Sequence, residues 1–386
     1  MKVIGVICEF DPLHLGHASL LRAIRQRFGE DAAVVCVMSG DYVQRGAPAV
    51  FGKYVRAEAA AACGADVVLE LPVTRVLSSA EGFASGGVEL LRRLGCADAL
   101  AFGCECGNAP RLTAVAQTMA RPEYDEALRE ALKGGCSYAA AREAALCSLG
   151  GDGALLRKPN DILAVEYCRA ILRQKADLEV FAVQRTGDYH DETPDPRSPS
   201  AAAVRNLLAS GGDWLPYIPP EARAIFADAP RHFAKSGERA MLARLRAMSE
   251  SEWEKTAHGS EGLWRKAMKA AHTEPTVAKI AEAAKSKRYP MTRIHRLLLC
   301  AYLGLTADDL REPVEDCRVL ASSERGRAVL RECRKTASIA LKNPGEPTLC
   351  AERDRRCADL YALFAEDDAQ LAPGAERAAR INLAKK

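Results

Sequence analysis

The chain has 386 residues, of which 48% are hydrophobic and 27% are charged, so we expect a soluble globular protein with two domains. No apolar run reaches the ~18 residues that a membrane span needs, and no small-residue cleavage site follows the first segment, so we expect a cytoplasmic protein without a membrane partner. The formal net charge is only +3, but residues 231–296 carry 15 Lys and Arg against 7 Asp and Glu, which points to a polyanion partner for the second half.

The first half of the chain alternates short apolar runs with helical patterns. The apolar runs, which predict buried strands, are residues 2–8, 32–38, 66–71, 99–102 and 178–183. The helical patterns between them include residues 17–28, 53–63 and 81–94. This alternation predicts an α/β fold with a doubly wound, Rossmann-like parallel sheet, whose ligands bind beyond the carboxyl ends of the strands.

The rest of the chain predicts mostly helix. Residues 111–149 are Ala-rich and read as a helical insertion between the fourth and fifth strands. The strand pattern stops after about Val183, a helix follows over residues 200–210, and DWLPYIPP at 213–220 reads as a linker. We therefore expect an α/β domain over residues 1–212 and a mostly α-helical domain over 213–386. The fourteen Cys are scattered singly, which predicts reduced thiols.

The strongest motif is HLGH, His14 to His17, in the loop after the first predicted strand. Gly16 would let a phosphate approach the backbone, and the helix that starts there offers free N–H groups. His14 and His17 could donate hydrogen bonds to phosphate oxygens whose charge grows as the α-phosphate is attacked. The alternative is a metal pair or two ordinary loop histidines. The position after the first strand favours a nucleotide site with both histidines as catalytic residues.

Other polar residues follow the later strands. Arg45, in MSGDYVQRG, could position phosphate, acetate or an RNA backbone, or could simply be solvated. Cys104-x-Cys106 suggests a metal, but without a second ligand cluster the sequence predicts none. Further along the chain, Lys285, Lys287, Arg288, Arg293 and Arg296 surround Tyr289. This basic cluster predicts contacts with RNA phosphates, and the alternative is a solvated helix face.

Five segments, in this order and spacing, resemble the tRNA(Met) cytidine acetate ligase family of the HIGH-motif nucleotidyltransferase superfamily. They are EFDPLHLGH, MSGDYVQRGAPAVFGKYVRAEAAAACGADVVLELP, FGCE, KPNDILAVEY and QRTGDYHD. The resemblance implies a ligase that first makes acetyl-adenylate and pyrophosphate from ATP and acetate. The wobble cytidine of elongator tRNA(Met) then takes the acetyl group, giving N4-acetylcytidine and AMP. The implied partners are ATP, with Mg²⁺, acetate and tRNA, and no DNA.

The resemblance also implies site residues. The residues that it assigns to ATP contacts are Ile7, Cys8, Glu9, Phe10, Asp11, Pro12, Leu13, His14, Leu15, Gly16, His17, Leu20, Gly103, Asn160, Arg185 and Arg205. The residues that we expect to contact tRNA are Arg45, Lys287, Arg288, Arg293 and Arg296.

Three positions depart from the family pattern. The family usually has Ser-Ala-Thr-Ser-Ile-Arg where this chain has hydroxyl-free Ala202 and Ala203, and it commonly has Asn where this chain has Asp11. Two alternatives stay open: a nucleotidyltransferase that acts on a phosphorylated small molecule, and a catalytically decayed RNA-binding protein.

Overall fold

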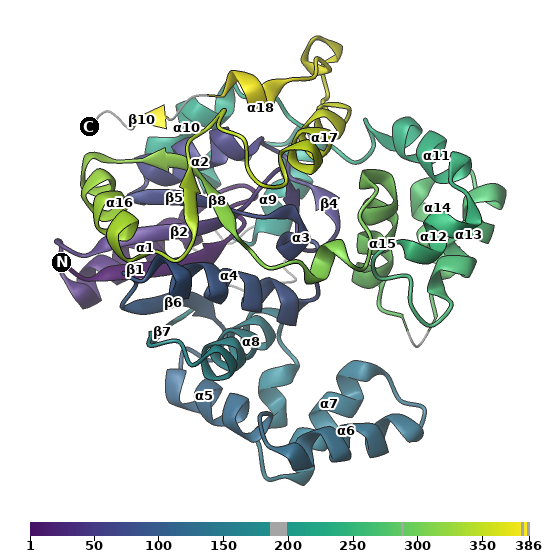
Figure 1. Ribbon diagram of the computed structural model, residues 1–386, viewed down its shortest axis with the longest axis horizontal. Helices are drawn as coiled ribbons and strands as arrows, with labels where there is room; N and C mark the ends of the chain where they lie inside the picture. Colours follow the sequence, from purple (N-terminus) through teal and green to yellow (C-terminus); the bar gives the residue numbers. More distant parts are fainter. Residues whose placement is uncertain (186–198, 287–288, 380–381, 384–386) are drawn as a thin grey trace.

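A mostly parallel sheet forms the centre of the molecule in the computed structural model, which describes residues 1–185, 199–286, 289–379 and 382–383 (Figure 1). Its strand order is β10-β8-β5-β2-β1-β6-β7, with β9 paired to β8. The strands are β1 (Val3–Cys8), β2 (Ala33–Ser39), β5 (Val67–Leu71), β6 (Ala99–Cys104), β7 (Glu179–Gln184), β8 (Asp316–Ser322), β9 (Ala340–Lys342) and β10 (Asn382–Leu383). A separate hairpin pairs β3 (Tyr42–Val43) with β4 (Ala47–Pro48).

The predicted doubly wound parallel sheet is confirmed. Strands β5, β2, β1, β6 and β7 run parallel and coincide with the five apolar runs. Alternate residues of β1 enter two different cores: Val3 and Ile7 pack on one face of the sheet, and Ile4 and Val6 pack on the other. Burial on both faces explains why these strands are apolar at nearly every position.

Helices cover both faces of this sheet. Those of the first half of the chain are α1 (Leu15–Phe28), α2 (Lys53–Ala62), α3 (Val73–Val76), α4 (Ala80–Leu94), α5 (Ala109–Thr118), α6 (Pro122–Lys133), α7 (Tyr138–Ser148), α8 (Pro159–Gln174) and α9 (Ala201–Ser210). Helices α4 and α8 contribute to the core that contains Ile7, whereas α1, α2 and α9 contribute to the core that contains Ile4. Helices α5 to α7 lie between β6 and β7, where the sequence predicts an insertion.

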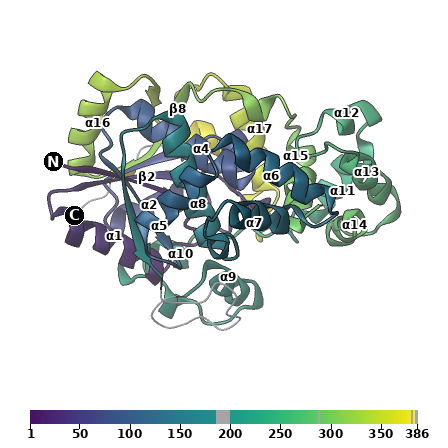
Figure 2. The same cartoon turned by 90° about the horizontal axis from the view of Figure 1, so that it is seen from below.

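The second half of the chain begins with helices but does not stay helical. Its helices are α10 (Pro220–Ala227), α11 (Glu238–Ala247), α12 (Glu250–Lys255), α13 (Leu263–Thr273), α14 (Val277–Ala284), α15 (Met291–Leu303), α16 (Glu324–Thr336), α17 (Ala351–Ala362) and α18 (Ala375–Ala378). Figures 1 and 2 both place α11 to α14 to one side of the sheet. Trp253 and Trp264 are buried in this group of helices, as expected of core anchors.

The expectation that strands end after Val183 is wrong. Strand β8 pairs antiparallel with β5, so the chain returns to the sheet after the helices. The pattern of β8 is hidden in the sequence because the buried strand contains charged residues, among them Arg318. An ion pair from Arg318 to Glu70, 2.7 Å long, makes that burial tolerable.

Residues 213–220 are not the free linker that the sequence suggests. Trp214 and Ile218 are buried, and the ring centroids of Trp214 and Phe51 are 5.9 Å apart. Helix α10, which follows, packs against α2. A tryptophan and an isoleucine among prolines can be core residues, so proline content alone does not identify a free linker. The division of the chain at residue 212 stays a prediction.

One pair of cysteines contradicts the expectation of reduced thiols. Cys96, just after α4, and Cys333, in α16, form a disulfide with Cα atoms 5.8 Å apart. The partners are 237 residues apart, so single scattered cysteines give no hint of the pairing. In the part of the chain that the structure describes, no helix is long and apolar enough to cross a membrane.

Candidate active site

A cavity of about 370 Å³ opens beyond the carboxyl ends of β1, β6 and β7. It lies at the point where the strand order reverses between β1 and β6, which is where open α/β sheets bind their ligands. The predicted site residues that line it are Ile7, Cys8, Glu9, Phe10, Asp11, His14, Gly16, His17, Leu20, Arg45, Gly103, Asn160, Arg185 and Arg205. Residues from distant parts of the chain therefore meet at one site.

Three of the residues predicted to contact ATP are not part of this lining. Leu13 is fully buried and belongs to the core of the sheet, while Pro12 and Leu15 shape the turn into α1. A motif of consecutive residues cannot present every side chain to one cavity, because the turn points some of them into the protein.

The two histidines form a paired cap at the start of α1. His14 is the N-cap: its Nδ1 accepts from the backbone N–H of Gly16 at 3.1 Å. The backbone N–H of His14 donates to Nδ1 of His17 at 3.2 Å, and the two rings stack with centroids 3.7 Å apart. Because both Nδ1 atoms accept, each neutral ring carries its proton on Nε2. Nε2 of His14 is buried without a hydrogen-bond partner among the described residues.

The surroundings keep both rings neutral. Burial, followed by the positive charges of Arg185 and Arg205, lowers the pKa of His17 to about 3. Burial, the neighbouring His17 and the same two arginines hold the pKa of His14 well below its usual value. At neutral pH the pair therefore offers two neutral Nε2–H donors rather than two cations.

This burial predicts a stability that falls in acid. Below pH ~6.5 the unfolded chain binds protons at these histidines that the folded chain does not. The contribution of the neutral pair to the free energy of unfolding is therefore fully present above that pH and is lost as the pH falls towards 3. Each histidine should contribute a slope of about 1.4 kcal/mol per pH unit. Urea unfolding at pH 7.5, 6.5 and 5.5 measures the slope of the free energy of unfolding against pH. This slope should be smaller for His17→Asn, and it should equal that of the parent protein for His272→Asn, at an exposed position. Equal slopes in all three proteins would contradict the neutral pair.

Asp11 is neutralised by arginines. Its buried carboxylate accepts from Arg45 at 2.5 Å and from the backbone N–H of Val50 at 2.7 Å, and Arg205 lies 3.7 Å away. Burial alone would raise the pKa of Asp11, but the charges of Arg45 and Arg205 hold it below its usual value. The charge that replaces the family's common Asn is thus compensated within the protein.

Gly103 and Asn160 sit on opposite sides of the turn after β6. A Cβ at Gly103 would lie 3.3 Å from Cγ of Arg185, so glycine leaves room for that side chain. Asn160 Nδ2 donates to the carboxylate of Glu105 at 2.8 Å. Lys158 occupies the N-cap position of helix α8, and Asn160 and Asp161 lie in its first turn.

The sequence places Lys53 and Arg56 at the start of a helix near the site, but it does not predict that Arg56 holds the loops of the site together. The Arg56 side chain is fully buried and donates to the backbone carbonyls of Glu9, Ser39, Gly40 and Phe51. It therefore joins the loops after β1 and β2 to the start of its own helix. In the sequence, Arg56 is visible only as a basic residue near the start of the helix that follows the second predicted strand.

The start of α9 brings the hydroxyl-free segment to the cavity. Ser200 caps this helix by accepting from the backbone N–H of Ala203 at 3.1 Å. Ala201 and Ala202 line the cavity, whereas Ala203 is buried. A helix N-terminus there still offers backbone donors to an anion, without side-chain hydroxyls at Ala201 and Ala202.

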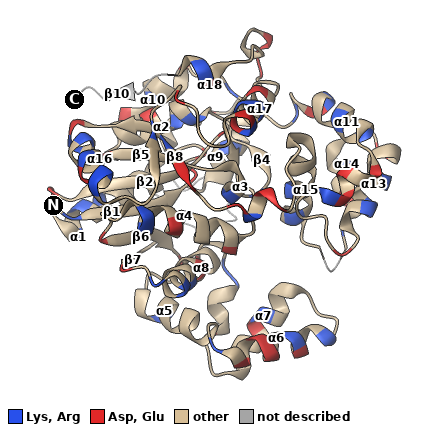
Figure 3. Ribbon diagram, in the orientation of Figure 1, with Lys and Arg blue, Asp and Glu red and all other residues tan. Residues whose placement is uncertain are grey.

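The predicted basic cluster is not one exposed face. Arg296 is only 7% exposed and donates to the backbone carbonyl of Gln44 at 3.2 Å, so the expectation that it contacts RNA is wrong for this conformation. Arg293, in α15, bonds to Ser260 and Glu261 in the turn that precedes α13. Lys287 and Arg288 lie outside the described residues. Figure 3 shows acidic as well as basic residues on the group of helices α11 to α14.

Comparisons with known proteins agree with this geometry. A family model described as HIGH Nucleotidyl Transferase matches residues 1–372. The tRNA(Met) cytidine acetate ligase of Acetivibrio thermocellus is 32% identical over 88% of both chains, and that of Syntrophomonas wolfei is 33% identical over 94% of this chain and 95% of its own. A crystal structure of Thermotoga maritima TmcAL bound with alpha-thio ATP is 28% identical, covers 100% of both chains and gives a TM-score of 0.89. The chain therefore belongs to the tRNA(Met) cytidine acetate ligase family of HIGH nucleotidyl transferases.

Proposed function

We propose that this protein is a tRNA(Met) cytidine acetate ligase, which activates acetate with ATP and transfers the acetyl group to the wobble cytidine of elongator tRNA(Met). The observation that carries the proposal is the neutral His14–His17 pair at a helix N-terminus, in a cavity that also holds Arg185 and Arg205. This combination suits a triphosphate, because arginines and helix N–H groups bind the anion while the histidines face the reacting phosphorus.

In the first step, a carboxylate oxygen of acetate attacks the α-phosphorus of ATP, and the bond to the β-phosphate oxygen breaks to release pyrophosphate. Negative charge grows on the non-bridging α-phosphate oxygens in the transition state. The Nε2–H groups of His14 and His17 would donate to these oxygens, and fixed donors in a buried site need no reorganisation. In the second step, the N4 amine of cytidine attacks the acetyl carbon, loses a proton, and AMP leaves.

Among the residues that the structure describes, two carboxylates line this cavity, and both already have partners. Glu9 and Asp11 are the carboxylates of the lining, and Glu9 already accepts from the backbone N–H of Gln44 at 2.6 Å while Asp11 pairs with arginines. A Mg²⁺ ion would therefore be held mainly by the ATP phosphates, as is usual for this cation.

Nucleoside mass spectrometry tests the proposal after incubation of the protein with ATP, acetate and elongator tRNA(Met). We expect N4-acetylcytidine only when all three substrates are present, and acetyl-adenylate from ATP and acetate without tRNA. Binding of ATP and tRNA without formation of either product would instead support a catalytically decayed RNA-binding protein. The alanines at the start of α9 make this the leading alternative.

Replacing Asp11 with asparagine is expected to tighten ATP binding. The asparagine keeps an oxygen for the N–H of Val50 but removes a negative charge that Arg45 and Arg205 now neutralise. One charge removed from a partly solvated anion site should lower the dissociation constant about three- to tenfold. Calorimetric titration measures this, with Asp31→Asn at an exposed position as the matched control. Weaker binding in Asp11→Asn would mean that Asp11 is needed to position the arginines.

The helical part should contact tRNA through Lys287 and Arg288. If both neutralise RNA phosphates, a Lys287→Ala/Arg288→Ala variant should lower the slope of log affinity against log salt by roughly 0.7 to 0.9 per lost contact. Acetyl-adenylate formation should be unchanged, because activation takes place at the carboxyl ends of β1 and β6. The matched control is Arg334→Ala/Lys335→Ala, two adjacent exposed basic residues on α16. An unchanged salt slope in the first variant would remove this pair from the interface.

A further inference from the structure

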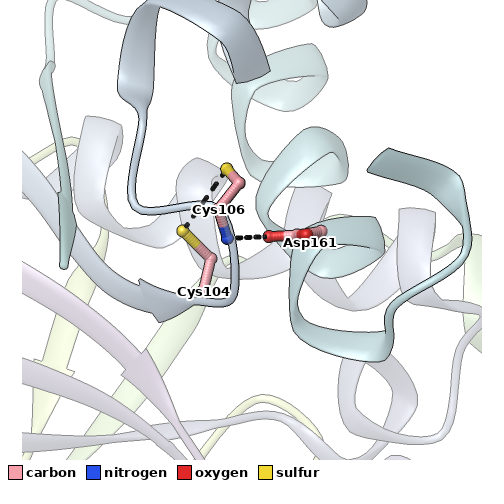
Figure 4. Close-up of side chains that lie close together, drawn as sticks. All are labelled: Cys104, Cys106 and Asp161. Atoms are coloured by element: carbon pink, nitrogen blue, oxygen red, sulfur yellow. Dashed lines mark hydrogen bonds between the residues drawn. The ribbon is translucent and has the colours of Figure 1, made fainter. Parts of the chain in front are cut away.

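Three potential metal ligands meet beside the cavity, on the elements that carry Gly103 and Asn160. Cys104 ends β6, Cys106 follows in the turn, and Asp161 lies in the first turn of α8 (Figure 4). The two Sγ atoms are 4.0 Å apart, and one sulfur or oxygen atom of each residue lies within 4.8 Å of the others. The sequence alone shows only the Cys-x-Cys pair, and the fold supplies the carboxylate.

The spacing of these atoms suits a single tetrahedral ion. Zn²⁺ binds thiolates at about 2.3 Å, so two thiolates on one tetrahedral Zn²⁺ are about 3.8 Å apart. The observed separation of the sulfur atoms is 4.0 Å, and a carboxylate oxygen of Asp161 lies within 4.8 Å of both, so the three ligand atoms are close enough together to surround one ion. A water molecule would complete the coordination.

The surroundings of the three residues favour a cation. Asp161 is 3% exposed, and no Lys or Arg of the described residues forms an ion pair with it.

Two features work against binding. Burial raises the pKa of the Cys104 thiol to about 12, so a cation must displace thiol protons. One carboxylate oxygen of Asp161 already accepts from the backbone N–H of Cys106 at 2.9 Å. The second carboxylate oxygen and the remaining lone pairs of the first are available for coordination.

We propose that Cys104, Cys106 and Asp161 bind one thiophilic divalent cation of the Zn²⁺ type, next to the nucleotide cavity. The cation would clamp the turn after β6 to the start of α8. Glu105 lies between the two cysteines, and its carboxylate accepts from the backbone N–H of Asp161 and from Nδ2 of Asn160, both at 2.8 Å. Through Glu105, an occupied site fixes Asn160 against the cavity. This metal site does not depend on the proposed acetyl transfer.

Cobalt binding tests the site in the full-length protein. After chelator treatment under reducing conditions, we expect one Co²⁺ per chain to produce a thiolate-to-cobalt charge-transfer band, and Zn²⁺ to displace it. The band should be absent from Cys104→Ser/Cys106→Ser and present in the matched control Cys136→Ser/Cys147→Ser, which removes two exposed thiols. Asp161→Asn should weaken Zn²⁺ binding at least tenfold while leaving both thiols in place.

Thermal unfolding gives a second measurement. Zn²⁺ that binds only the folded chain should raise the melting temperature of the parent protein and of the control, but not that of Cys104→Ser/Cys106→Ser. If the double serine variant does not fold, Asp161→Asn carries the test through its weaker Zn²⁺ binding. The proposal is overturned if the parent protein shows no charge-transfer band, if the band survives in the double serine variant, or if it is lost from the exposed-thiol control.

Discussion

Replacing His17 with alanine is expected to slow acetyl-adenylate formation by about a hundredfold, which is the usual effect of losing one transition-state donor. The loss should appear in kcat rather than in ATP affinity, because the donated hydrogen bond strengthens only as charge grows on the α-phosphate. His17 also accepts the backbone N–H of His14, so the start of α1 loses one hydrogen bond. Single-turnover release of pyrophosphate measures the rate.

The control separates chemistry from structure. His17→Asn keeps a side chain that can both accept from the backbone N–H of His14 and donate into the cavity, so it should retain more activity than His17→Ala. His272→Ala, at an exposed position, should leave the rate unchanged. A rate for His17→Ala equal to that of the parent protein would remove His17 from the mechanism. Equal losses for alanine and asparagine would point to the imidazole ring itself.

The parallel half of the sheet could be predicted because its strands follow a simple rule. Strands β1 and β2 are buried on both faces, so nearly every residue is apolar and the pattern is visible without knowing the fold. Strand β8 breaks that rule, because Arg318 is buried against acidic groups from distant parts of the chain. The sequence alone does not distinguish a buried charged residue from an exposed one, because the partner that neutralises it lies elsewhere in the chain.

The same limit applies to the site. HLGH could be recognised because its function depends on neighbouring residues at one turn. The roles of Arg56 and Arg296 could not be predicted. Both side chains are buried, and each bonds to backbone carbonyls of a segment that the sequence does not connect to it. The compensation of Asp11 by Arg45 and Arg205 likewise joins three separate segments.

Replacing Arg56 with methionine is expected to destabilise the protein by about 3 kcal/mol or more and to abolish ATP binding. Methionine fills part of the volume but donates no hydrogen bond, so the buried carbonyls of Glu9, Ser39 and Gly40 lose a partner, and each unsatisfied group costs about 1 to 3 kcal/mol. Glu9 begins the loop that carries Phe10 and Asp11 into the cavity, so that loop should shift as well.

Chemical unfolding at neutral pH and a calorimetric ATP titration measure the two effects. Arg22→Met, on the exposed side of α1, makes the same change of side chain without buried partners and should alter stability by less than about 0.5 kcal/mol. Arg56→Lys should fall between them, because an ammonium group keeps the charge but cannot span carbonyls on separate loops as a planar guanidinium does. If Arg56→Met unfolds like the parent protein and binds ATP with the same affinity, the loops after β1 and β2 are held by their own packing, and the guanidinium contributes nothing that the site needs.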